Sequence, residues 1–247
     1  DTYWLAEPLR VGVNQKHSLY VMGGEGNFMF GLGGAYNGIT GVMKESKRQV
    51  LSGNIDLIYR ISKFQFSNKF SINKVDYDNP VVSFSEYARS NPYYKKRNGN
   101  GIIEPWLEYN DQAKLANPLW NANLNSRDLG KNLSLTNYFI AEWNPNSMWK
   151  LRGRFGLTYN SDKTENFISP ENTNQILNKE NSKRGEYKTT NTCGTQYEGE
   201  FTVTFARLLG KHRMNLVGGG NVFSSESLLE GYSVEGFPAG DFTYPSF

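Results

Sequence analysis

The histidines, acids and lone thiol of the chain are the side chains that could support metal or nucleophilic chemistry. His17 and His212 are the only histidines, and neither has ligands nearby in the sequence, whereas zinc needs three or four. Asp76 and Asp78 begin like a calcium loop, but a proline and the lack of later ligands break that pattern. Cys193 has no basic residue beside it to activate the thiol. We therefore expect no metal, no cofactor and no enzymatic activity.

Aromatic residues in the longest polar stretch of the chain are the candidates for ligand contact. Such rings stack on sugars or pack against protein. The alternative is that they pack a large loop against itself, and the sequence leaves both open. The candidates are Tyr93, Tyr94, Trp106, Tyr109 and Trp120.

The stretch from Trp149 to Asn160 shows the kind of element that positions these loops. Its alternate residues are apolar, aromatic or glycine, and those between are charged, small or polar. A period of two predicts a β-strand with one apolar and one polar face. The apolar face has an aromatic at each end, and three cations lie on the other face. This length and pattern favour a lipid-facing barrel strand over a strand of a soluble sandwich.

The same alternation recurs in four predicted hairpins that follow an entry segment, 1–15. The hairpins are 16–37, 50–73, 132–160 and 195–224. Turns within them are short, and the connections after them are long: 38–49, 74–131, 161–194 and 225–247. This alternation puts every tight turn at one end of the sheet. We therefore predict one all-β domain over 1–247: about eight strands of a larger antiparallel transmembrane β-barrel, with short periplasmic turns and long extracellular loops.

The predicted pairing divides the side chains of the strands between two faces. It places Val21 opposite Phe30, Tyr59 opposite Phe66, Phe139 opposite Gly153 and Phe201 opposite Gly218. Rings opposite glycines are typical of strongly bent sheets. The residues expected to face lipid are Phe30, Tyr59, Phe66, Trp143, Trp149, Phe155 and Phe205. Those expected to face the lumen are Lys69, Glu142, Lys150, Arg152, Arg154, Glu198 and Glu200.

Composition excludes several other classes of protein. No run approaches the roughly 18 apolar residues of a spanning helix, and only 38% of the chain is hydrophobic. The net charge is +3 without a basic tract, so nucleic acid is not an expected partner. The chain begins at Asp1 without a methionine or signal peptide, which suggests a piece of a larger protein.

Several short motifs resemble the first part of the barrel in the SusC/RagA family, the TonB-dependent outer-membrane transporters of Bacteroidetes. Each is weak alone, but together they span nearly the whole chain. They are Trp4–Arg10, His17–Tyr20, Gly23–Gly24, Tyr36–Asn37, Gly41–Met43, Ser85–Arg89, Asn91–Tyr94, Asn117–Leu119, Leu151–Phe155, Ser169–Glu171 and Gly236–Phe242.

The resemblance implies a segment of a barrel of about 22 strands in the bacterial outer membrane. It implies import of a glycan or peptide, a SusD-like surface lipoprotein over the extracellular mouth, and a TonB complex acting through parts that this chain lacks. Two alternatives stay open on the sequence: a secreted carbohydrate-binding β-sandwich, and a small closed outer-membrane barrel without a transport role.

Overall fold

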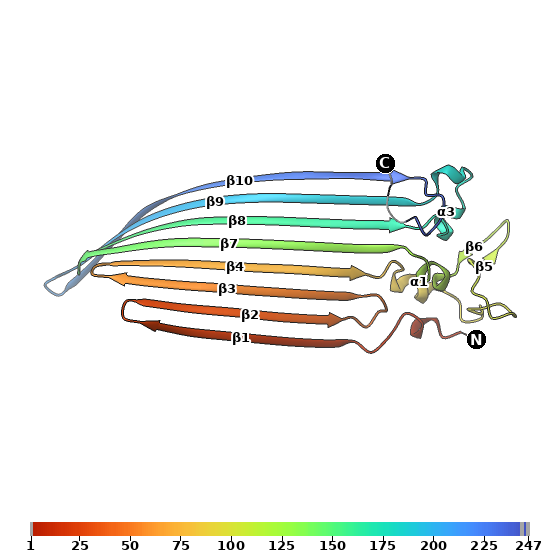
Figure 1. The fold of residues 1–247 in the computed structure, drawn as a ribbon, viewed down its shortest axis with the longest axis horizontal. Coiled ribbons are helices and arrows are strands. Elements are labelled where there is room, and N and C mark those ends of the chain that lie inside the picture. The colour runs from red at the N-terminus through yellow and green to blue at the C-terminus, as the bar shows by residue number, and fades with distance from the viewer. Residues whose placement is uncertain (1, 243–244, 246–247) are drawn as a thin grey trace.

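The computed structural model describes residues 2–242 and 245, and its dominant element is one long antiparallel sheet (Figure 1). The strands pair in chain order, β1-β2-β3-β4-β7-β8-β9-β10. The predicted all-β antiparallel fold is confirmed. The strands are β1 (Val13–Glu25), β2 (Phe28–Thr40), β3 (Lys47–Ile61), β4 (Phe64–Asn79), β7 (Arg127–Asn146), β8 (Trp149–Ile168), β9 (Glu186–Leu209) and β10 (His212–Glu235).

The remaining elements are short and lie in the connections at one end of the sheet (Figure 1). None of the helices in the described ranges is long and apolar enough to cross a membrane. These elements are η1 (Trp4–Ala6), α1 (Phe84–Arg89), β5 (Trp106–Tyr109), β6 (Lys114–Ala116), α2 (Pro118–Ala122), α3 (Thr173–Ile176) and η2 (Asn181–Lys183).

The sorting of connections follows the prediction, but their lengths do not. All four tight turns lie at the left end in Figure 1, and the longer connections lie at the right. The strands run farther than predicted, so the connections shrink to 41–46, 80–126, 169–185 and the segment from 236 onward. Backbone groups pair whatever the side chain, and the ladder therefore continues through polar stretches where the apolar alternation has ended. Of the predicted last loop, residues 243–244 and 246–247 lie outside the described part, as does Asp1 of the entry segment.

Register differs from the prediction by two residues in three of the four hairpins. Tight turns form at Gly26-Asn27 and Gly210-Lys211, where Gly26 and Gly210 have φ of +58° and +61°. An even shift leaves every side chain on its predicted face, because alternate residues share a face. The predicted pairing of Tyr59 with Phe66 is confirmed. The corrected pairs are Val21 with Leu32, Phe139 with Phe155, and Phe201 with Gly220.

Successive tight turns lie progressively farther along the sheet (Figure 1). If the directly paired residues are followed from strand to strand, Phe28, the first residue of β2, aligns with Phe201 in β9. Since β9 continues from there to Leu209, the last hairpin extends about eight residues beyond the first. The axes of these two hairpins are six strand spacings apart. At ~3.3 Å per residue and ~4.8 Å per spacing, the offset corresponds to a tilt of about 40°. Barrel strands tilt by about 35–45°, so the stagger is that of a barrel wall.

No second sheet covers the long sheet in the part of the chain described. The only other sheet is the β5-β6 pair in the loops, which argues against the sandwich alternative. β1 and β10 are the two edges and do not pair with each other, so these strands form an arc and not a small closed barrel. The buried clusters are small and lie at the long-connection end: Trp4 with Val82 and Tyr87, and Phe167 with Tyr187 and Phe237.

Candidate functional site

The register places the two predicted sets of strand residues on opposite faces of the sheet. All seven residues expected to face lipid share the apolar face, and all seven expected to face the lumen share the polar face. Lipid and lumen themselves stay predictions. What the structure establishes is that these two sets of residues lie on opposite surfaces of the sheet.

Aromatic rings on the apolar face gather near the tight turns. Phe64 stacks on Trp143 with ring centroids 5.7 Å apart, and Trp149 contacts Phe205 at 4.7 Å. Farther from the turns, Phe201 lies between Gly153 and Gly220 of the flanking strands. A band of aromatic side chains near the turns is typical of the membrane–water interface of barrels.

The apolar face is also uncovered. Phe155 and Phe201 are each 52% exposed, and Leu216 is 58% exposed. Monomeric soluble proteins rarely expose apolar surface that is continuous over so many strands. This face therefore requires either hydrocarbon or another protein against it.

Ion pairs cross the polar face at three neighbouring strands. Glu142 of β7 contacts Lys150 Nζ at 3.0 Å and Arg152 Nε at 3.5 Å, and its direct register partner is Arg152. Arg154 Nη2 lies 3.4 Å from Glu198 and 3.0 Å from Glu200. These predicted lumen residues therefore neutralise one another, and most of their charge is balanced by ion pairs within the sheet.

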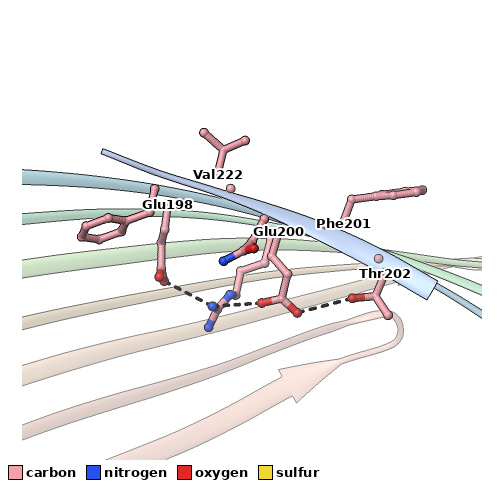
Figure 2. A pocket seen from close by; sticks show the side chains of 11 residues that line it. Glu198, Glu200, Phe201, Thr202 and Val222 are labelled. Atoms are coloured by element: carbon pink, nitrogen blue, oxygen red, sulfur yellow. Dashed lines mark hydrogen bonds and ion pairs between the residues drawn. The ribbon is translucent and has the colours of Figure 1, made fainter. Parts of the chain in front are cut away.

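A hollow of about 400 Å³ adjoins this ladder between β8, β9 and β10 (Figure 2). Glu198 and Glu200 line it, and the Thr202 hydroxyl donates to Glu200 over 3.4 Å. Figure 2 shows Phe201 and Val222 on the other side of the sheet from the two glutamates. The hollow is open, and apolar residues (Phe201, Val222 and Phe223) line it together with the glutamates.

The long connections are held together by a small core. Trp4 of η1 and Tyr87 of α1 are 2% and 3% exposed, and both pack with Val82. The Trp4 indole also donates to the Asn91 carbonyl over 3.0 Å. Burial, with Glu45 next in effect, raises the pKa of Tyr87 to about 12. The entry segment thus anchors the connection between β4 and β7.

A second junction joins two connections that are about fifty residues apart. The Asn121 side chain accepts from the Thr173 backbone N–H at 3.0 Å and donates to the Thr173 hydroxyl at 2.8 Å. Both residues are buried. The Trp120 indole donates to the Glu171 carbonyl over 2.9 Å, so this predicted ligand aromatic has a partner within the protein.

The other predicted ligand aromatics have three different environments. Tyr93 is 81% exposed. Tyr94 packs on the small core, and its hydroxyl donates to Glu108, which raises the pKa of Tyr94. Trp106 and Tyr109 contact each other with centroids 5.2 Å apart and line a cleft. These last two therefore share one cavity.

That cleft, of about 860 Å³, lies between β5 and the segment around α3. One wall is the unbroken run 104–109, and the other includes residues 176–179. Lys114, Lys179 and Arg184 also line the cleft. No local sequence pattern predicts the second wall, because segments some seventy residues apart meet there.

Metal-ligand side chains do not converge in the described ranges, where no group of three or more His, Cys, Asp or Glu could hold an ion. His17 lies in β1 and His212 in β10, at opposite edges of the sheet.

Comparison with known proteins supports the fold. No protein-family model matches this chain, and no curated protein does. Among solved structures, the RagAB peptide importer in its closed-closed state matches with a TM-score of 0.78 over 99% of this chain. The RagAB peptide transporter and the open-open importer match with TM-scores of 0.78 and 0.76, each over 98%.

These likenesses are structural, since each match has 15% sequence identity. The chain spans 28%, 28% and 27% of the three matched chains. The arc of eight strands and its loops therefore have the fold of part of a RagAB transporter chain. This agrees with the SusC/RagA resemblance of the short motifs.

Proposed function

We propose that this chain forms part of the wall and the extracellular loops of a SusC/RagA-type outer-membrane importer. The observation that carries the proposal is the uncovered apolar face, which is continuous across eight tilted strands with rings gathered near the tight turns. In a membrane this face lies in hydrocarbon, and the polar face with its ion-pair ladder lines the interior. The role is structural and non-enzymatic.

The proposal includes the partners of such an importer. The long connections contribute to contact with a SusD-like surface lipoprotein, and outer-membrane lipid surrounds the wall. A TonB complex drives transport through regions outside this chain. Of the two substrate classes, glycan and peptide, the likeness to a peptide importer favours peptide.

Epitope insertion tests the orientation. We place a short epitope in the exposed loop beside Gly101, and in a second variant at Gly210 in the last tight turn. Both sites have backbone conformations that favour glycine, with φ of +78° and +61°, so the insertion goes after each glycine and not in its place.

Antibody staining of intact cells should detect the loop epitope alone. Permeabilised cells should expose both epitopes equally, which controls for expression. Recovery of the protein in the soluble fraction, or staining of the turn epitope on intact cells, would contradict the proposed wall.

A further inference from the structure

The cleft beside β5 presents a strand edge. Six consecutive residues, 104–109, line it. Successive side chains of a strand point to opposite faces, and the register of β5 shifts between Trp106 and Glu108, so the unbroken run brings the backbone of β5 as well as its side chains to the cleft. β6 pairs with the other edge of β5, and no further backbone hydrogen bond from 106–109 reaches another described segment.

The cleft also has an excess of uncommitted positive charge. Lys114, Lys179 and Arg184 line it, and none of them forms an ion pair with a described residue. Lys114 lies over the Tyr109 ring, with its Nζ 5.6 Å from the centroid. The Arg184 guanidinium donates two hydrogen bonds to the Asn178 carbonyl, at 3.0 and 2.9 Å, which fixes its position in the wall.

The two acids of the cleft are hydrogen-bonded to neutral donors and keep their charge. Glu104 accepts from the Asn98 side chain over 2.9 Å. Glu108 accepts from the Asn110 side chain over 2.9 Å and from the Tyr94 hydroxyl. The three cations exceed the two carboxylates by one charge, so the cleft carries a net positive charge that favours an anionic ligand.

We propose that this cleft binds an extended peptide with acidic side chains, which adds as a strand to the free edge of β5. Main-chain hydrogen bonds to a sheet edge supply affinity in this mode of recognition, and side-chain pockets supply selectivity. Trp106 and Leu177 provide apolar contact for side chains of the peptide. A sugar has no backbone ladder to match the edge, so the free edge favours a peptide over an acidic glycan.

The inference rests on the proposed function and deepens it, because the cleft would be an outer capture site for cargo. The test uses the complete transporter in detergent micelles and isothermal titration with a blocked peptide, Thr-Glu-Val-Glu-Thr. Comparison ligands are the same peptide with Gln for Glu, two versions N-methylated on opposite sets of alternate amides, and a galacturonic acid pentamer.

The variant combines Lys114→Gln with Lys179→Gln. Lys183→Gln is the matched control. Lys183 is an exposed lysine of the connection that contains Lys179, and its Nζ is already paired with Glu180 at 2.7 Å. We expect the double variant to bind the acidic peptide about twofold to thirtyfold more weakly, and the control to bind it unchanged. The Gln peptide should lose a similar factor on the unmodified protein and a smaller one on the double variant, in which Arg184 is the remaining cation of the cleft.

N-methylation should weaken binding at least about tenfold for one set of amides and much less for the other, as a one-sided strand ladder requires. Equal binding of both methylated peptides, or a charge-dependent response to the galacturonic acid pentamer alone, would overturn the inference. A transporter that passes the epitope test but binds no peptide refutes this cleft site and leaves the proposed wall intact.

Discussion

A lysine placed on the apolar face at mid-wall is the sharpest test of the membrane assignment, and Phe201 is the position we choose. Phe201 is 52% exposed on that face and lies four residues from Phe205, which belongs to the ring cluster near the turns. At ~3.3 Å per residue and a tilt of about 40°, this places Phe201 roughly 10 Å from the cluster. A barrel's apolar band is about 25 Å tall, so Phe201 lies close to its middle.

A lysine at the midplane of a membrane barrel costs about 2–4 kcal/mol. We therefore expect Phe201→Lys to lower the free energy of unfolding by at least that amount, a shift of roughly thirtyfold to a thousandfold in the folding equilibrium. Thr202→Lys is the depth-matched control, because Thr202 faces the opposite side beside Glu200 (Figure 2). Its cost should stay within about 1 kcal/mol.

Guanidinium titration of the complete transporter refolded into lipid vesicles measures both values, with Phe201→Leu reporting the loss of the ring alone. Equal costs for the two lysine variants would refute the assignment of the apolar face to hydrocarbon. A soluble protein with this face bound to a partner would instead lose association with that partner.

Three further predictions concern the loops and the polar face. Asn121→Ala leaves the buried N–H and hydroxyl of Thr173 without partners, and each lost hydrogen bond costs about 1–3 kcal/mol of stability. Limited proteolysis of 80–126 and 169–185 should therefore accelerate, whereas Asn100→Ala should leave the proteolysis rate unchanged. Because burial raises the pKa of Tyr87 to about 12, the neutral phenol contributes stability that is fully present below pH ~10, the ordinary pKa of tyrosine. That stability is lost as the pH rises toward about 12. Hydrogen exchange of α1 should show this loss, and Tyr87→Phe should abolish it. Glu142→Gln removes two partly exposed ion pairs and should cost no more than about 1–2 kcal/mol, less at high salt, and a larger salt-independent loss in the same titration would contradict the exposure of these pairs.

Sequence reasoning recovered the faces of the sheet more reliably than its exact register. Alternation assigns a side only, and an even slip leaves that assignment unchanged. The turn after Glu25 uses two residues instead of four, and Gly26 with its positive φ makes the shorter turn accessible. At Ser62-Lys63 the apolar residues abut the turn on both sides, so the register could be predicted there.

Contacts between the loops could not be predicted from local sequence patterns, for a different reason. Trp120 and Asn121 contact the connection that contains Glu171 and Thr173, and the cleft joins segments equally distant in the chain. Such contacts depend on which strand ends the sheet brings together. The aromatic content of the loop indicated that rings would matter, but not that Tyr94 and Trp120 would be engaged within the protein while Trp106 and Tyr109 line a cavity.

The strands lengthen steadily along the sheet, from 13 residues in β1 and β2 to 24 in β9 and β10. If the tight turns lie level at one membrane surface, those additional residues raise the opposite rim by roughly 28 Å at a tilt of about 40°. This part of the proposed wall would then have a sloping rim, low beside β1 and high beside β10. A lid or cargo descending from above would meet the high flank first and would approach the interior obliquely, from the low side.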